Sequence, residues 1–142
     1  MIVRREVITR TGASEAYDYL SDFTTTNEWD PGTVRTERVE GDGGVGTVYR
    51  NTSSFAGRTT ELTYVVTELR APELIALRGE NASLVALDTM TLEPTAGGTR
   101  VVYQADFRFK GVWRLVAPFL RPAFRRLGDE AQAGLKAALD RR

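Results

Sequence analysis

The chain has 142 residues, 42% of them hydrophobic, and a formal net charge of zero, which fits a single domain spanning residues 1–142. It contains neither His nor Cys, so a Ser-His-Asp triad, a thiolate nucleophile, a zinc site of the usual type and haem ligation by either residue are excluded. Because 19 Lys plus Arg balance 19 Asp plus Glu, the chain has no overall basic field, and we expect no nucleic-acid partner.

The remaining residue types leave a short list of functions. Carboxylates, Tyr, Lys and Arg can still exchange protons, or the chain can bind a ligand without chemistry. The acidic residues show neither the spacing of a calcium loop nor a tight cluster, so we expect no metal and no cofactor. Arg4, Arg5 and Glu6 stand where a secretory signal has its apolar run, and no stretch approaches about eighteen uninterrupted apolar residues. We therefore expect a cytoplasmic protein.

The amino-terminal part of the chain predicts a strand and two short helices. Residues 2–10 have the pattern of a strand, and Ser14 is a suitable N-cap for the helix that follows. Apolar residues recur at helical spacing as far as Phe23. A second helical turn over 24–29 ends at Asp30-Pro31-Gly32, a sequence typical of a turn.

The central part, from Thr33 to Lys110, predicts six antiparallel strands. Turn residues interrupt it about every ten residues, a spacing too short for the crossover helices of a parallel sheet. One interruption, residues 41–46, matches the glycine pattern of a dinucleotide-binding loop, but a strand follows it instead of a helix, so we interpret it as a hairpin loop. The expected strands are 33–40, 45–55, 58–70, 74–80, 83–93 and 100–110.

Alternation of apolar and polar residues indicates which face of the sheet is buried. It is clearest in the last strand, where one face is almost wholly polar and the other carries Val101, Tyr103, Ala105, Phe107 and Phe109. The sheet is therefore expected to be covered on one side only. The same parity orients the other strands, except 33–40, which is polar on both faces.

A long amphipathic helix closes the chain. Apolar residues recur at intervals of three and four from Trp113 to Leu139, which predicts a helix lying across the sheet, with Trp113 in the core. Pro118 and Pro122 fall inside this stripe, and each removes a backbone donor. We therefore expect a kink or break near 118–122 and a continuous helix over 122–140.

The order strand, two short helices, six antiparallel strands and a long helix resembles the helix-grip fold (α+β) of the SRPBCC superfamily, which includes START lipid-transfer domains and birch-pollen-type allergens. The sequence looks most like its bacterial polyketide cyclase/dehydrase-like branch. The resemblance spans nearly the whole chain and is carried by Asp22-Phe23 with Glu28-Trp29-Asp30-Pro31, Leu92-Glu93-Pro94 with Gly97-Gly98-Thr99-Arg100-Val101, and Leu127-Gly128-Asp129-Glu130 with Leu135-Lys136.

This resemblance implies a curved sheet of about seven strands that wraps around the last helix, with an apolar cavity between them. A ligand would enter near the two short helices and the adjacent loops, where Trp29 would either line the opening or cap the core. Small inward residues such as Ala86 and Ala105 would leave space in the cavity.

The candidate site consists of inward-facing residues. Asp88 is the one charged residue among the inward positions, and it is the best candidate for catalysis, because burial raises the pKa of a carboxyl group toward the range of a general acid or base. A structural carboxylate satisfied by protein donors is the alternative, so no catalytic residue is assigned. The predicted ligand pocket comprises Trp29, Tyr49, Asn51, Tyr64, Asp88, Met90, Tyr103 and Phe107.

These residues favour binding of a hydrophobic or aromatic small molecule, polyketide-like or lipid-like. The resemblance leaves two versions open: a cyclase or dehydratase, and a carrier, sensor or lipid-transfer module without chemistry. A third alternative concerns residues 107–128, which hold six Lys or Arg and no acidic residue. This basic segment could contact an anionic membrane or an acidic partner, but a solvated helix face is the favoured interpretation. The sequence leaves open whether the protein is a monomer or a homodimer.

Overall fold

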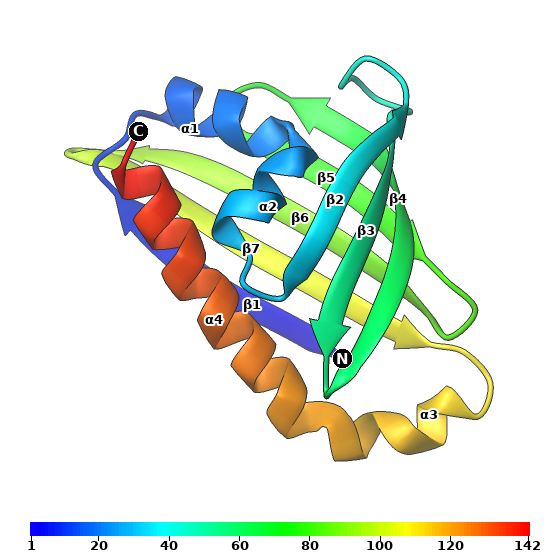
Figure 1. The fold of residues 1–142 in the computed structure, drawn as a ribbon. Helices are drawn as coiled ribbons and strands as arrows, with labels where there is room; N and C mark the ends of the chain where they lie inside the picture. The colour runs from blue at the N-terminus through cyan, green and yellow to red at the C-terminus, as the bar shows by residue number, and fades with distance from the viewer.

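The computed structural model describes all residues, 1–142, as one curved antiparallel sheet that wraps around a long helix (Figure 1). The strands lie in the order β1-β7-β6-β5-β4-β3-β2. They are β1 (Ile2–Thr9), β2 (Thr33–Glu40), β3 (Val48–Phe55), β4 (Arg58–Arg70), β5 (Leu74–Glu80), β6 (Leu84–Thr95) and β7 (Gly98–Phe109). The predicted helix-grip architecture is confirmed.

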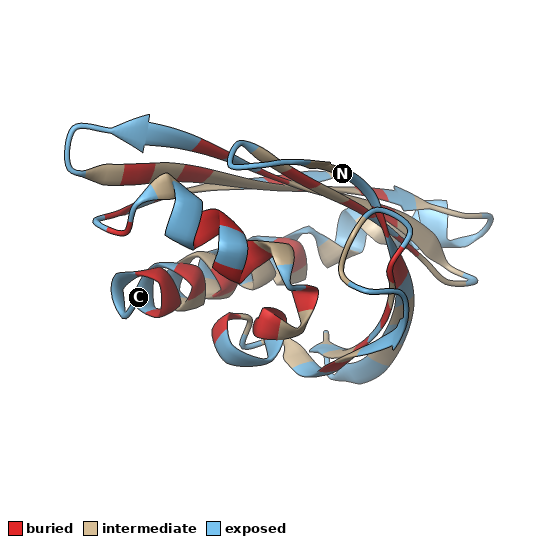
Figure 2. Ribbon diagram, turned by 90° about the horizontal axis from the view of Figure 1, so that it is seen from above, coloured by how far each residue is buried: buried red, intermediate tan, exposed pale blue.

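Most of the helical segments lie on the concave side of the sheet, as Figure 2 shows, and one short helix extends past the end of the sheet (Figure 1). None of them has the length and apolar character needed to cross a bilayer. They are α1 (Ala13–Ser21), the 3-10 turn η1 (Phe23–Thr25), α2 (Thr26–Trp29), α3 (Trp113–Val116), the 3-10 turn η2 (Ala117–Leu120) and α4 (Arg121–Asp140).

The topology follows from the short connections. Strands β2 to β7 form a meander in which each strand pairs with the next, while β1 pairs with β7 at the other edge. The chain therefore crosses from one edge of the sheet to the other through α1 and α2, and this crossing closes one end of the concave face. Alternation along the strands sends apolar side chains to that face, where they form the core with α1 and α4.

Two glycines let α4 approach its neighbours closely. A Cβ atom at Gly128 would lie 2.6 Å from Val3 Cγ1 on β1, and a Cβ atom at Gly134 would lie 1.9 Å from the carbonyl oxygen of Trp29. Any side chain at either position would push the helix away. These glycines thus fix the depth of the space between α4 and the sheet.

The ends of the helices correct two expectations. Helix α1 begins at Ala13, and the carbonyl of Gly12 accepts the first helical hydrogen bond from the Ala16 amide at 2.9 Å, so Ser14 lies inside the first turn and is not the N-cap. The predicted break near Pro118 and Pro122 is confirmed, because α3, η2 and α4 follow one another there. Trp113, expected in the core, is 39% exposed, because this break carries α3 past the end of the sheet.

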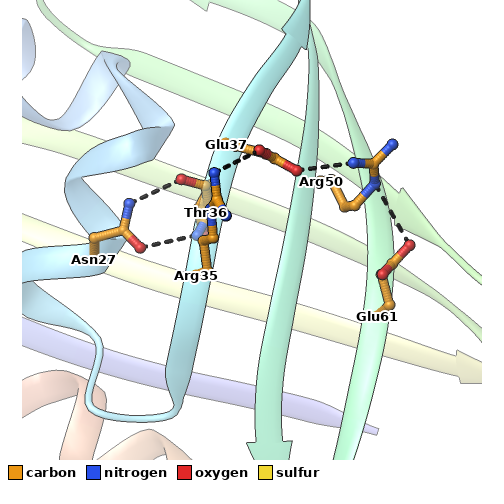
Figure 3. Close-up of polar contacts among 6 residues, drawn as sticks. All are labelled: Asn27, Arg35, Thr36, Glu37, Arg50 and Glu61. Carbon is orange, nitrogen blue, oxygen red and sulfur yellow. Dashed lines mark hydrogen bonds and ion pairs between the residues drawn. The ribbon is translucent and has the colours of Figure 1, made fainter.

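Polar contacts hold the edge strand β2 in place (Figure 3). The side-chain amide of Asn27 on α2 donates to the Thr36 carbonyl and accepts from the Thr36 amide, both at 2.8 Å, as a neighbouring strand would do. On the outer face, Glu37 bridges to Arg50 of β3, which also reaches Glu61 of β4. Strand β2 is thereby fixed to α2 on one side and to β3 and β4 on the other.

Candidate functional site

A cavity of about 550 Å³ lies between the concave face of the sheet and the carboxy-terminal helical segments. Six of the eight predicted pocket residues line it: Trp29, Asn51, Tyr64, Asp88, Tyr103 and Phe107. Tyr49 and Met90 do not. Both are about 1% exposed and belong to the core, where the Tyr49 ring packs against Phe23 with 5.6 Å between ring centres.

Strand register brings Asp88 and two tyrosines together at the inner end of the cavity. Asp88 on β6 pairs with Leu77 on β5 and with Ala105 on β7, and Tyr103 is two residues from Ala105 on the same face. Tyr64 on β4 reaches across β5 because its ring lies over Gly79, where a Cβ atom would come within 2.6 Å of the ring. A glycine in the middle strand therefore lets the Tyr64 ring extend toward Asp88.

The Asp88 carboxyl group is buried, and its hydrogen bonds do not fully replace those that it would make with water. It is 4% exposed, and its Oδ1 atom has no hydrogen-bond partner. Burial, and secondly the negative charge of Asp30, raise the pKa of Asp88 to about 7, while the hydroxyls of Tyr64 and Tyr103 act in the opposite direction. Both protonation states of Asp88 are consequently populated near neutral pH.

The same burial and the same nearby carboxyl group shift the pKa values of Tyr64 and Tyr103. Burial, and secondly the charge of Asp88, raise the pKa of Tyr64 and of Tyr103 well above the ordinary tyrosine value. Both hydroxyls therefore stay protonated at neutral pH and can donate hydrogen bonds. The inner end of the cavity thus offers two phenol donors and a carboxyl group with a free oxygen.

Asp30 is a second carboxylate at this inner end, and it was not among the predicted site residues. Its Oδ1 accepts from the Gly32 amide at 3.0 Å, and its Oδ2 accepts from the Thr33 hydroxyl at 2.9 Å. Burial raises the pKa of Asp30, and these two donors oppose the rise. In the sequence, Asp30 is accounted for as the first residue of an Asp-Pro-Gly turn. No local pattern indicates that this turn faces a cavity.

The Trp29 side chain both lines the cavity and seals the core beneath it. It is 3% exposed, its Nε1 donates to the Thr25 hydroxyl at 3.3 Å, and its ring meets Tyr103 edge-on with 6.0 Å between centres. The side chain of Asn51 is engaged as well, because it donates to the Thr36 hydroxyl at 2.7 Å. These contacts hold the wall of the cavity in a fixed shape.

Comparison with known proteins identifies the family of the chain. The model of the family described as "Polyketide cyclase / dehydrase and lipid transport" matches residues 2–140. The chain belongs to this family. No curated protein sequence matches it.

This member of the polyketide cyclase/dehydrase and lipid transport family shares its fold with several solved structures. The Zhui aromatase/cyclase from Streptomyces sp. R1128 superimposes with a TM-score of 0.86 at 17% identity, over 100% of this chain and 94% of that one. TTHA0849 from Thermus thermophilus gives 0.82 at 15% identity, over 98% and 97% of the two chains. Ara h 8.0201 gives 0.59 at 18% identity, over 94% and 98%. At these identities the likeness establishes the fold alone.

In this family member the open end of the cavity lies between the β3–β4 hairpin and α3. The exposed lining residues are Ala56, Arg58 and Thr59 in the β3–β4 hairpin and Trp113 and Val116 in α3. The β3–β4 side of this opening adjoins the loop after α2, because the Ser54 amide donates to the Gly32 carbonyl at 2.9 Å, whereas the contribution of α3 was not predicted. We call the opening between the β3–β4 hairpin and α3 the mouth.

An aromatic wall connects the mouth to the inner end. Phe124 of α4 packs against Phe55 and Phe107 with 4.6 Å between ring centres, and against Phe109 with 5.8 Å. Phe124 belongs to the apolar stripe of the last helix, which predicts that it lies in the core. The stripe cannot distinguish a core residue from one that lines a cavity. The structure shows that it serves both purposes.

Proposed function

We propose that the protein binds an apolar, ring-containing small molecule in the cavity and that Asp88 exchanges a proton with it. The single observation that supports this most strongly is a buried carboxyl group with an unpartnered oxygen on the wall of a 550 Å³ cavity. A buried acceptor without a partner costs about 1–3 kcal/mol, a cost that a ligand donor would remove. A membrane-facing role for the basic segment does not account for this group.

The charges of the lining define the ligand further. Asp30 and Asp88 stand at the inner end, and the one cationic lining residue, Arg58, stands at the mouth. A carboxylate or phosphate at the inner end would meet two acids and no base. The ligand therefore carries a neutral or cationic hydrogen-bond donor, such as a phenol or enol hydroxyl, at the end that enters first.

Proton exchange follows from the same geometry. With a pKa of about 7, Asp88 can accept a proton from an acidic carbon or hydroxyl and return it to another atom of the ligand. The protonated hydroxyls of Tyr64 and Tyr103 can donate to the oxygen on which negative charge develops. Such a site suits cyclisation or dehydration of a chain that the cavity holds in a folded form, which agrees with the family description.

Calorimetric titration with three matched naphthalenes tests the binding. β-Naphthol has a donor, β-methoxynaphthalene lacks one, and β-naphthoate is an anion. We expect β-naphthol to bind about tenfold more tightly than either of the others. The Asp88→Asn variant should lose most of this preference, whereas Asp18→Asn, at an exposed position on α1, should keep it. Tightest binding of β-naphthoate would contradict the proposed ligand class.

Deuterium exchange at the acidic carbon of benzoylacetone, followed by NMR, tests the proton transfer. The wild-type protein should accelerate exchange with an apparent pKa near 7, and Asp88→Asn should abolish the acceleration while still binding the diketone. Unchanged exchange in Asp88→Asn would remove Asp88 from the chemistry. Binding without acceleration by the wild type would favour a carrier, the second candidate, which the words "lipid transport" in the family description support.

A further inference from the structure

Residues 112–120, which comprise Val112, α3 and η2, carry two sets of apolar side chains, one that lines the cavity and one that faces solvent. Trp113, Val116 and Leu120 face the cavity. On the other side Val112, Leu115 and Phe119 are 73%, 76% and 83% exposed, the highest values of any large hydrophobic residue in the chain. Figure 1 shows this segment at the end of the molecule opposite the carboxy terminus. We call Val112, Leu115 and Phe119 the apolar tip.

Positive charges surround the apolar tip, and several of them have no acidic partner. Arg108, Lys110 and Arg126 are in ion pairs. Arg114, Arg121 and Arg125 form no ion pair with any acidic residue of the chain. Unpaired guanidinium groups beside exposed apolar side chains complement a surface that is both anionic and apolar.

These three arginines line a groove beside the tip. The groove has a volume of about 490 Å³, and its floor is formed by Val3, Phe109 and Phe124. Its fourth arginine, Arg5, is already engaged with Asp129 at 3.0 Å. The groove therefore presents unsatisfied guanidinium groups at its rim over an apolar floor, the chemistry that holds an anionic lipid headgroup.

We propose that the apolar tip and these arginines dock the protein on a membrane that contains anionic lipids, with the mouth of the cavity against the bilayer. Phe119, Leu115 and Val112 enter the boundary of the acyl chains while Arg114, Arg121 and Arg125 meet the headgroups. A second copy of the chain is a poorer occupant, because a symmetric contact would bring these arginines against each other. The proposal holds whether or not the cavity ligand undergoes chemistry.

The location of the mouth suggests that docking would deliver a ligand from the bilayer to the cavity. Trp113 and Val116 line the mouth, and Leu115 lies between them in sequence on the uncovered side. An apolar ligand could then pass from the bilayer into the cavity without crossing water. This step concerns how the ligand arrives, and it is independent of what Asp88 does.

Co-sedimentation with vesicles tests the proposal directly. The wild-type protein should bind vesicles of phosphatidylcholine mixed with phosphatidylglycerol, bind pure phosphatidylcholine weakly, and lose binding as salt rises. Reversal of three charges in Arg114→Glu/Arg121→Glu/Arg125→Glu should weaken binding by about a hundredfold or more. The double variant Leu115→Ser/Phe119→Ser should weaken binding by at least tenfold to the same vesicles.

Control variants separate docking from general effects on charge and hydrophobicity. The triple variant Arg10→Glu/Arg38→Glu/Arg141→Glu changes the net charge by the same six units at exposed positions away from α3, and it should keep most of the wild-type binding. Val45→Ser in the β2–β3 loop should bind like wild type. Far-UV circular dichroism confirms the fold of every variant. Absence of binding to anionic vesicles, equal losses in control and tip variants, or a dimer in solution that Leu115→Ser/Phe119→Ser dissociates would each overturn the proposal.

Discussion

Replacing Asp88 with asparagine should change how the stability of the protein depends on pH. Burial and the neighbouring Asp30 raise the pKa of Asp88 from its usual value of 3.8 to about 7 in the folded state. The folded protein therefore holds the Asp88 proton more tightly than the unfolded chain. The stability associated with this proton is fully present below about pH 4, falls as pH rises toward 7, and then levels off.

The size of the effect follows from the pKa difference. Complete ionisation of Asp88 costs about 4 kcal/mol, and about 2–3 kcal/mol of this cost falls between about pH 5 and about pH 8. The asparagine side chain of the variant cannot ionise, so the free energy of unfolding of Asp88→Asn should rise by that amount relative to wild type over the same interval. A constant effect of the substitution cancels in this comparison.

Urea unfolding at several pH values measures this difference, with Asp18→Asn as the matched control at an exposed site. The control should follow the wild type at every pH. A gap between wild type and Asp88→Asn that does not vary with pH would refute the argument that Asp88 is a buried acid with a raised pKa.

Two further predictions concern glycines that shape the cavity. Gly79→Ala should lower the free energy of unfolding by about 1–3 kcal/mol, because its Cβ atom would come within 2.6 Å of the Tyr64 ring, whose displacement should also weaken β-naphthol binding. Gly134→Ala should cost at least as much and shift the fluorescence of Trp29, because its Cβ atom would lie 1.9 Å from the Trp29 carbonyl oxygen. Gly12→Ala, which meets no atom within 4 Å, should cost less than about 1 kcal/mol in the same urea titrations. Equal losses in all three variants would contradict both contacts.

Much of the fold could be predicted because its signals are local. Side chains alternate along a strand, so the faces of Tyr64, Asp88 and Tyr103 follow from parity within each strand. The break at Pro118 and Pro122 likewise follows from the covalent structure of proline. These signals need no knowledge of which strands are neighbours.

The rest depends on contacts between distant parts of the chain. That Tyr64 lies over Gly79 depends on the register between β4 and β5, which includes an irregularity between Val66 and Glu68. The part that α3 plays in the mouth could not be predicted, because it depends on where α3 and the β3–β4 hairpin meet, and no local pattern encodes that meeting. Asp30 was missed for the same reason. A turn signal describes a backbone, and it does not show which space the turn faces.

The charges at the two ends of the cavity separate ligand binding from membrane docking. The arginines of the groove beside the apolar tip attract an anionic headgroup, but Asp30 and Asp88 would repel it at the inner end of the cavity. The headgroup therefore stays outside while a neutral molecule enters. Asp88→Asn should therefore relax the discrimination against β-naphthoate without changing vesicle binding. The variant Arg114→Glu/Arg121→Glu/Arg125→Glu should weaken vesicle binding by about a hundredfold or more without changing the order of the three naphthalenes. A change of both properties in either variant would mean that one site serves both functions, and the separation drawn from the charges would then be wrong.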